Sequence, residues 1–332
     1  MSNTSQFPLP NSSPLPFRFG RVWKFEIETY DGAEVFTIQT SLPPNNVFIP
    51  EQLHITFDTT QTIQQAFWYC DISIYNLNPV TMNILITQGM KVTLGAGYQI
   101  LGGITTTTDV IFEGTVLQPI WTRENGVDDK LTLHCVCGLI EVTNNFIAQS
   151  IAGGITQREL VAQMAQLCHF PLDANDVDIS STTKLSRASV FFGSPADAFQ
   201  SIADSNNSNL WFTNQALHIR ELREQTTKPT IVYGPSSGLI GVPQQTQDGV
   251  EMKMLLDPKI TIMTQVQLQA GTIINQLQRS IPSLPTILDA NNTYVVGRVR
   301  HYGDSRGNDW YTEVTGFVNA ASILALASGF AA

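Results

Sequence analysis

Charged residues are scarce in this chain of 332 residues, and cations are scarcer than anions. Asp, Glu, Lys and Arg together make up 14% of the sequence, with 18 Lys and Arg and a formal net charge of −10, against about 25% charged residues in average globular proteins. Duplex DNA is read by proteins that neutralise phosphates with Lys and Arg, so this composition argues against a DNA reader. A weakly charged, acidic surface suits packing against other subunits, and it would let nucleic acid slide past without sticking.

Two further absences in the sequence bear on the cellular compartment in which the protein is assembled. The first 20 residues, MSNTSQFPLPNSSPLPFRFG, have no basic start and no apolar stretch, so we expect no secretory signal. The sequence also has no run of about 18 apolar residues that could cross a membrane as a helix. The four cysteines, Cys70, Cys135, Cys137 and Cys168, follow no disulfide spacing. The sequence therefore predicts assembly in a reducing cytoplasm.

The chain divides into four segments by pattern. Residues 1–17 form a Pro- and Ser-rich arm that buries too little by itself to offset its chain entropy, so we expect it to order only on assembly. Residues 18–149 and 229–332 are predicted to be β domains, and residues 150–228 a small α/β domain inserted between them. A chain of this length can bury a full core in two or three domains.

Alternating side chains mark the strands of both β domains. In FRFGRVWKFEIETY, Trp23, Phe25 and Ile27 share one face, and Val22, Lys24, Glu26 and Glu28 share the other. Turn residues separate the predicted strands, Asn78-Pro79 and Asn125-Gly126 among them. Strands are expected at 17–30, 53–57, 68–75, 91–94, 110–118, 130–136, 260–268, 293–301 and 310–318. This spacing predicts barrels or sandwiches, and the two β domains suggest an internal pseudo-repeat without residue identity.

Two helix starts mark the α/β domain. Thr156 and Glu159 have the spacing of a capping box, and Ser194-Pro195 places proline at the first helical position. The expected buried stripes are Leu160, Met164, Leu167 and Cys168 on the first helix, and Ala198, Phe199 and Ile202 on the second. A compact hairpin is expected at 210–220.

Residues that could bind a metal do not converge. On a strand, Cys135 and Cys137 point to one face and His134 to the other, so the three cannot share a zinc ion without a bulge. We expect the cysteines to pack as small hydrophobic residues. Cys168 and His169 are adjacent at a helix end, where their side chains point about 100° apart, which argues against a catalytic dyad.

The remaining candidates for chemistry have structural explanations. Gly95-Ala96-Gly97 and Gly102-Gly103 lack the Lys-Ser or Lys-Thr pair of a phosphate loop and are interpreted as strand ends. Asp128-Asp129 and the group Asp173, Asp176 and Asp178 are expected to be solvated carboxylates, the latter in a polar loop. His301 and Asp304 lie within reach of each other in a turn, but no motif places a nucleophile beside them, and we expect Asp304 to hold the turn by accepting backbone amides. We predict no catalytic residues, no cofactor site and no metal site.

Seven strings, taken in their order along the chain, resemble baseplate hub proteins of contractile phage tails, a family related to the base of type VI secretion spikes. They are IYNLN at 74–78, IFEGT at 111–115, FGSP at 192–195, LWF at 210–212, GLIGVP at 238–243, HYGD at 301–304 and WYTE at 310–313. Each string is short, and their common order makes the resemblance specific. It covers residues 20–318, which is nearly the whole chain.

The resemblance implies a mainly β, non-enzymatic homotrimer. In that family, two tube-like β-barrel domains per chain make six similar positions from three chains, which adapts a sixfold tail tube to a threefold central spike. The implied partners are the tube or tube-initiator protein, the spike and other baseplate proteins, with DNA passing through the channel without specific binding. The implied location is the virion baseplate, after assembly in the host cytoplasm, and any cell-wall enzyme would be a bound partner.

Two other classes stay open at this point. A β-rich carbohydrate-binding protein or adhesin of a virion surface would need exposed aromatic residues near Asp or Asn, and Trp121, Trp211 and Trp310 are dispersed in the sequence. A hydrolase would have to use the scattered aspartates, and their spacing does not indicate a catalytic site.

Overall fold

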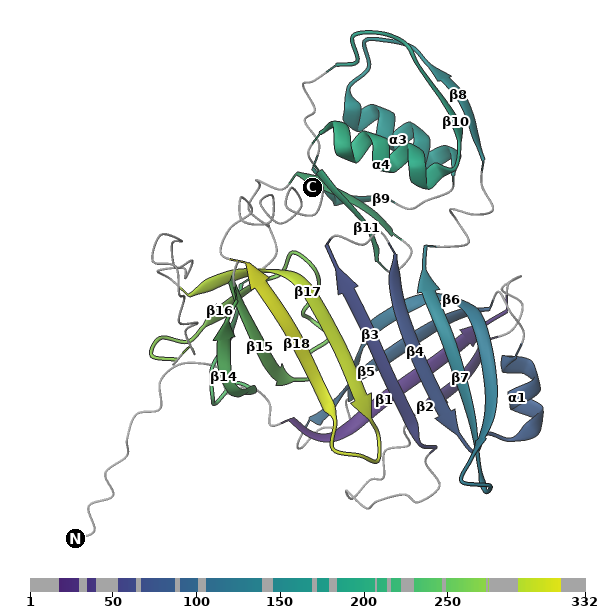
Figure 1. Ribbon diagram of the computed structural model, residues 1–332, viewed down its shortest axis with the longest axis vertical. Coiled ribbons are helices and arrows are strands. Elements are labelled where there is room, and N and C mark those ends of the chain that lie inside the picture. The colour runs from purple at the N-terminus through teal and green to yellow at the C-terminus, as the bar shows by residue number, and fades with distance from the viewer. Residues whose placement is uncertain are drawn as a thin grey trace.

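A computed structural model describes most of the chain (Figure 1). The described residues are 18–29, 35–39, 53–63, 67–86, 90–100, 106–138, 146–168, 172–178, 184–206, 208–213, 216–221, 230–246, 249–272, 274 and 292–317. The predicted arm, residues 1–17, lies outside them. None of the described helices is long and apolar enough to cross a membrane.

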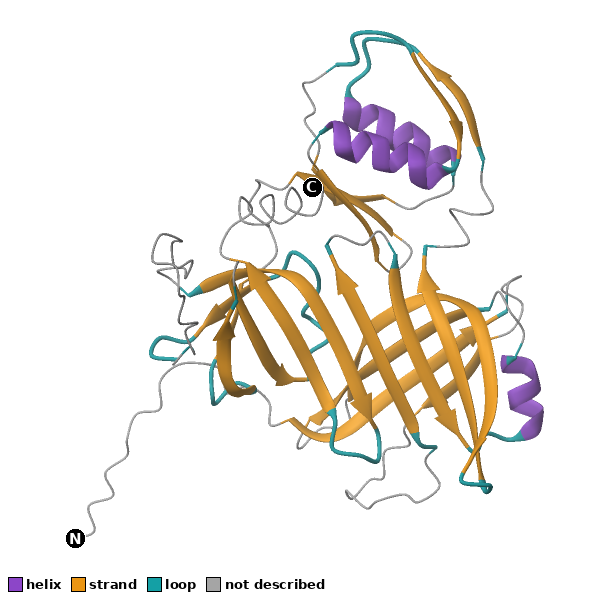
Figure 2. Cartoon of the chain, in the orientation of Figure 1, coloured by secondary structure: helices purple, strands orange, loops and turns teal. Residues whose placement is uncertain are grey.

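Strands dominate the structure, and three groups of elements follow one another along the chain (Figures 1 and 2). The first β unit comprises β1 (Arg18–Glu28), β2 (Val35–Gln39), β3 (Ile55–Thr62), β4 (Trp68–Tyr75), α1 (Pro79–Leu85), β5 (Lys91–Ile100), β6 (Thr106–Glu124) and β7 (Asp128–Cys137). The α/β unit comprises β8 (Ile147–Ile151), α3 (Gln157–Leu167), β9 (Leu172–Asp178), β10 (Ser189–Gly193), α4 (Pro195–Ser205), β11 (Ser208–Thr213) and β12 (Ala216–Glu221). The second β unit comprises β13 (Thr230–Tyr233), β14 (Leu239–Gln245), β15 (Gly249–Leu255), β16 (Gln265–Leu268), β17 (Thr293–Asp304) and β18 (Trp310–Phe317).

The two β units share one sheet. Its strand order is β14-β15-β18-β17-β3-β4-β7-β6-β5-β1-β2, and β16 also joins β17 and carries β13. The units meet where β17 pairs with β3, antiparallel, from Arg298 opposite Thr62 to Asp304 opposite Thr56. Within the described residues, no strand pairing closes either unit into a barrel, so the expectation of two closed barrels is not confirmed; the mainly β class is.

The second β unit repeats the strand order of the first. The series β3-β4-β7-β6-β5-β1 in one unit corresponds to β14-β15-β18-β17-β16-β13 in the other. The pairing of β6 with β7 slips by one residue between Val116 and Gln118, and the pairing of β17 with β18 slips between Val296 and Arg298. The last pair of strands differs between the two series, because β1 and β5 are antiparallel and β13 and β16 are parallel. The predicted pseudo-repeat is therefore present in the topology.

Two buried apolar clusters lie behind the shared sheet. The cluster of the first β unit, with Trp23, Phe25 and Phe112, continues into the α/β unit through buried residues of α3, α4, β11 and β12. The cluster of the second β unit is built around Tyr233, Val250 and Tyr294. In β1, alternate residues enter the core as predicted, because a strand sends successive side chains to opposite faces.

The α/β unit stands on one end of the sheet (Figure 2). α3 begins with the predicted capping box, in which Glu159 N donates to Thr156 Oγ1 and Thr156 N donates to the Glu159 carboxylate. α4 begins at Ser194 with proline at the first helical position, as predicted. The two helices lie beside a β8–β10 ribbon and a three-stranded sheet in the order β11-β12-β9.

Several local predictions were wrong for identifiable reasons. Asn78-Pro79 starts helix α1 rather than a turn, since Val80 N donates to Asn78 Oδ1 and proline suits a first helical position. Residues 172–178, expected as a polar loop, form β9 because they pair with β12. Leu167 is half-exposed, and Val161 and Ala165 take its place in the buried stripe of α3.

Other strand boundaries differ from the prediction. β6 runs over 19 residues, much longer than the predicted 110–118, because its two halves pair with different partners, β5 and β7. Residues 260–264 form a turn before β16, and Met263 there has a φ of 63°. β2, β8 and β10 were not predicted. The domain boundaries at 149/150 and 228/229 stay predictions.

Candidate functional site

One face of the shared sheet points away from both cores and is polar. In β3, Ile55, Phe57 and Thr59 are buried and the residues between them are partly exposed. β17 and β18 alternate in the same way. The residues that share this outer face include Thr56, Asp58, Thr60 and Thr62 of β3, Arg298, Arg300 and Tyr302 of β17, Glu313 and Thr315 of β18, and Glu251 and Lys253 of β15.

A ladder of ion pairs crosses this face where the two β units meet. Arg300 Nε donates to Asp58 Oδ1 at 2.9 Å, and its Nη2 donates to Asp58 Oδ2. Arg300 Nη1 donates to Glu313 Oε2 at 3.4 Å, and Lys253 Nζ lies 3.9 Å from Glu313 Oε1. Asp58 belongs to the first β unit, and Arg300, its cationic partner, belongs to the second. We call Lys253, Glu313, Arg300 and Asp58 the junction ladder.

The ladder continues into the first β unit through a pair of acids. Asp58 stands directly opposite Asp71 in the pairing of β3 with β4, and Asp71 stands opposite His134 in the pairing of β4 with β7. Two opposed carboxylates repel each other. Asp58 is held by Arg300, and His134 Nδ1 lies 2.6 Å from Asp71 Oδ1, so each acid has its own partner.

The rings of Tyr302 and Tyr311 lie against the cations of the junction ladder. Lys253 Nζ lies 4.1 Å from the Tyr311 ring centre and 5.3 Å from that of Tyr302, and the Arg300 guanidinium lies 4.6 Å from the Tyr302 ring. Burial would lower the pKa of Lys253, but the hydrogen bond to Tyr302 and the charges of Tyr302, Glu313 and Tyr311 raise it. Hydrogen bonding to Asp58 raises the pKa of Arg300. The acids and rings thus hold both cations in the charged form.

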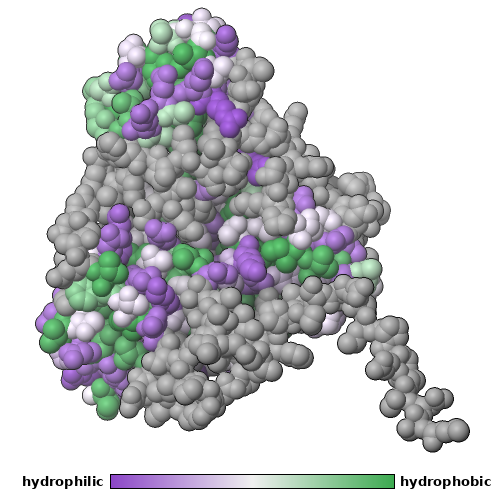
Figure 3. All heavy atoms as spheres, turned by 180° about the vertical axis from the view of Figure 1, so that it is seen from behind, coloured by the Kyte–Doolittle hydropathy of each residue, from purple (hydrophilic) through white to green (hydrophobic). Residues whose placement is uncertain are grey.

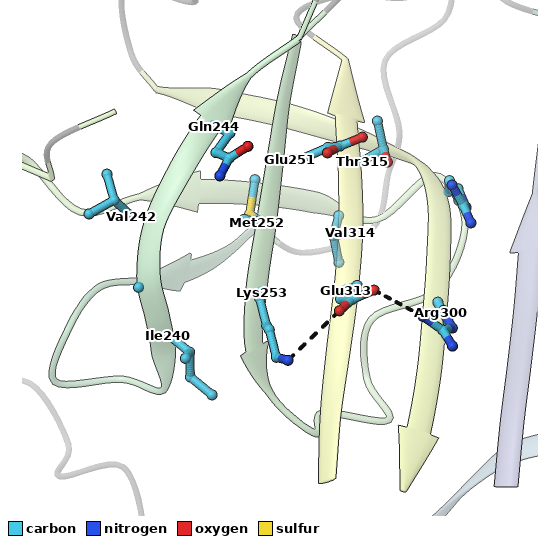
Figure 4. Close-up of a pocket in the computed structure, with 12 residues that line it drawn as sticks. Ile240, Val242, Gln244, Glu251, Met252, Lys253, Arg300, Glu313, Val314 and Thr315 are labelled. Carbon is cyan, nitrogen blue, oxygen red and sulfur yellow. Dashed lines mark hydrogen bonds and ion pairs between the residues drawn. The ribbon is translucent and has the colours of Figure 1, made fainter. Parts of the chain in front are cut away.

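A groove of about 520 Å³ lies over β14, β15, β18 and β17 (Figure 4). Ile240, Val242 and Gln244 of β14 form one wall, and Glu313 lies on the floor between Lys253 and Arg300. A smaller hollow of about 330 Å³ shares Arg300 and contains Asp58, Asp71, Asp304 and Asp309. In the part of the chain that the structure describes, no three His, Cys, Asp or Glu side chains are grouped to hold a metal ion.

The structure places the predicted metal candidates in separate environments. Cys70, Cys135, Cys137 and Cys168 are buried and form no disulfide, and burial raises the pKa of Cys135 and of Cys70, which stands opposite it. They pack as hydrophobic residues, as predicted. His134 points to the polar face and meets Asp71. His169 and Gly102-Gly103 lie outside the described residues.

His301 and Asp304 do not meet, contrary to the sequence prediction. His301 is buried against Thr312, its Nδ1 lying 2.9 Å from Thr312 Oγ1. Asp304 instead faces His54, whose Nε2 lies 2.7 Å from Asp304 Oδ1, and accepts the amides of Arg306 and Gly307. Its burial is outweighed by these hydrogen bonds, which lower its pKa. The predicted role of Asp304 in holding the turn is confirmed.

The other candidates are structural. Gly95-Ala96-Gly97 lies inside β5, paired on both sides, rather than at a strand end. Asp128 and Asp129 flank the Asn125-Gly126 turn, where Asp128 Oδ1 accepts from Asn76 Nδ2 and Asp129 Oδ1 from Arg123 Nε. Asp173, Asp176 and Asp178 belong to β9. The sequence prediction missed the junction ladder, and only the alternation of β3 and β17 could have suggested that Asp58 and Arg300 are surface residues.

A comparison with known protein families identifies the family of this chain. A model of the family described as Baseplate hub gp41 matches residues 35–316. This chain belongs to the baseplate hub gp41 family. The predicted resemblance is therefore confirmed, and the hub is a structural component of the phage tail rather than a member of an enzyme family. No curated protein matches the sequence.

Solved structures show where the fold recurs. The 43 kDa tail protein of prophage MuSo2 from Shewanella oneidensis superposes with a TM-score of 0.54 at 8% identity, over 90% of this hub and 98% of that chain. The tail protein from Neisseria meningitidis MC58 gives 0.56 at 8% identity, over 90% and 97%. The E. coli c3393 protein, a type VI secretion component, gives 0.51 at 7% identity, over 84% and 76%. At such identities the likeness concerns the fold alone.

Proposed function

We propose that this hub acts as a homotrimer that joins a sixfold tail tube to a threefold central spike. The observation that carries the proposal is the repeated strand order of the two β units within one sheet. Three copies would present six similar β units, which matches a sixfold partner on one side, while the α/β unit, present once per chain, gives a threefold pattern. Closed cyclic assembly of this kind needs a heterologous interface between copies.

The polar face of the shared sheet is proposed to line the channel through which DNA passes. Protein interfaces are depleted of charge at their centres, and this face carries a row of charges and threonines at its middle. Two of the three cations named on this face are already held, Arg300 by Asp58 and Glu313 and Lys253 by Glu313 and two tyrosine rings, whereas Arg298 is exposed. A phosphate would have to displace these partners, so DNA gains little by binding. Such a lining favours passage over retention.

Mass measurement and partner capture test the proposal together. The purified chain should give a mass of three chains by light scattering, and in a mixture with the tube and spike proteins of the same particle it should elute together with both partners from a size-exclusion column. A chain that stays monomeric with its partners present, or that retains neither, would contradict the hub proposal. Binding of glycans by such a monomer would favour the adhesin class.

A further inference from the structure

The pairing of β17 with β3 shows how two β units of this fold can contact each other edge to edge. β17 uses its first residues to pair with β16 and its last seven, Arg298–Asp304, to pair with β3, while β18 covers its other edge. The fourth strand of the series β14-β15-β18-β17-β16-β13 thus pairs with the first strand of the series β3-β4-β7-β6-β5-β1. Thr62–Thr56 of β3 supplies the opposite side.

β6 has the same construction as β17, but beyond Val116, whose N donates to Met90 O, one of its edges has no described strand beside it. Its first half, Thr106–Thr115, pairs with β5, and Thr115–Glu124 pairs with β7 on the other side. The strand slips after Val116 as β17 slips after Val296. Beyond Thr115, none of the described strands pairs with the edge of β6 that faces away from β7. That half corresponds to the part of β17 that pairs with β3.

β14 is the matching first strand, and its outer edge is also unpaired among the described strands. It corresponds to β3, because Gln244 stands opposite Glu251 as Asp58 stands opposite Asp71. β14 and β6 lie at opposite sides of the molecule (Figure 1). Two complementary edges on opposite sides of one chain make a head-to-tail contact that can close into a ring.

We propose that residues 118–124 of β6 pair, antiparallel, with β14 of a second copy of this chain, repeating the junction of β17 with β3. This inference rests on the proposed trimer and deepens it by naming the interface. Transfer of the register places Thr122 opposite Gln244 of the partner subunit, because Thr122 corresponds to Tyr302, which stands opposite Asp58.

The side chains at the two edges fit this contact. Leu117 and Trp121 are 51% and 50% exposed, and Val242 on β14 is 46% exposed. Trp121 stands opposite Leu131, which is buried in the core, and corresponds to His301, which is 2% exposed beside the junction within the chain. A neighbouring copy would cover Trp121 as the first β unit covers His301. Neither β14 nor residues 118–122 carries a charge, and the charges of the proposed segment, Arg123 and Glu124, lie at its end, although charged residues are a common protection of free edges.

Cross-linking tests the register directly. The double variant Thr122→Cys with Gln244→Cys places two thiols on exposed positions, and a short bis-maleimide linker should convert most of the protein into covalent dimers and trimers. The four native cysteines are buried, so the wild-type chain serves as the background. Thr122→Cys with Ser150→Cys, an exposed position of β8, is the matched control and should remain uncross-linked.

The outcomes separate the interface from the hub proposal. A trimer by light scattering that does not cross-link through positions 122 and 244 would overturn the interface and leave the hub proposal standing. A chain that is monomeric in every mixture with its partners would overturn both. As a second variant, Val242→Asp should keep the circular-dichroism spectrum of the folded wild type and lose the trimer, whereas Phe192→Asp, at another exposed apolar position, should keep the trimer. A trimer that tolerates Val242→Asp would also contradict the interface.

Discussion

Trp211 and Phe212 are consecutive residues of β11, and their side chains are buried in different cores. Phe212 belongs to the cluster of the first β unit, where its ring stacks on Phe67 with centroids 5.7 Å apart. Trp211 belongs to the cluster of the second β unit. Gln61 Nε2 of β3 donates to the Phe212 carbonyl at 3.2 Å. β11 thus fixes the α/β unit at the place where the two β units meet.

Removal of the Phe212 ring should destabilise the whole chain. Phe212→Ala leaves a cavity in a fully buried site, and such truncations cost about 3–5 kcal/mol. Phe192→Ala makes the same chemical change at a side chain that is 80% exposed, where surface changes stay within about 0.5 kcal/mol. Denaturant titrations of both variants measure the difference. Equal midpoints for the two would show that β11 does not hold the units together.

The junction ladder should control affinity for DNA. Asp58→Asn with Glu313→Gln removes the acids that hold Arg300 and Lys253, so their charges become available to phosphates. We expect at least tenfold tighter, salt-dependent binding of duplex DNA in filter-binding assays. Asp197→Asn with Asp204→Asn changes the net charge equally on exposed positions of α4 and should bind DNA as weakly as wild type. Equal affinities of the two double variants would remove the support for a self-neutralised lining.

His301 should make the fold sensitive to acid. Burial lowers its pKa to about 4, from an ordinary value of 6.5, so the unfolded chain takes up the proton first as the pH falls. Its contribution to stability is complete above about pH 6.5, is lost between pH 6.5 and 4, and changes no further below. A shift of this size corresponds to about 3 kcal/mol. Thermal unfolding of His301→Gln should show a smaller loss of stability from pH 7 to pH 4.5 than wild type. Parallel curves for wild type and His301→Gln would refute this role.

The capping box of α3 offers a smaller, local effect. Thr156→Ala removes the acceptor for Glu159 N, and loss of such a cap costs about 1 kcal/mol. Thr156→Ser keeps the hydroxyl and should retain most of the stability. Hydrogen exchange of the amides of the first turn of α3 distinguishes the two variants, and equally fast exchange in both would contradict the role of the cap.

Local signals in the sequence predicted most elements, because their causes lie within a few residues. The alternation around Trp23, the Thr156–Glu159 pair and the Asn125-Gly126 turn each determine structure nearby, and Asn125 and Gly126 both have positive φ, as a tight hairpin requires. Asn78-Pro79 is ambiguous at that range, since the same pair can form a turn or begin a helix. The polar sequence of β9 forms a strand only because β12 lies beside it.

The candidate site could not be predicted in the same way. Arg300 and Asp58 are separated by 242 residues, and only the pairing of β17 with β3 brings them together. The same pairing explains why His301 and Asp304, close in sequence, point to opposite faces of one strand and meet different partners. The resemblance to the hub family predicted a role in the phage tail, whereas only the three-dimensional structure showed that Arg300 and Asp58 meet.

Imaging of this chain inside an intact tail tests the central claim most directly. The account predicts three copies around the tail axis between tube and spike, with their six β units in similar positions and Arg300 and Asp58 facing the channel. Any other copy number, or a position at the periphery of the baseplate away from the axis, would contradict it.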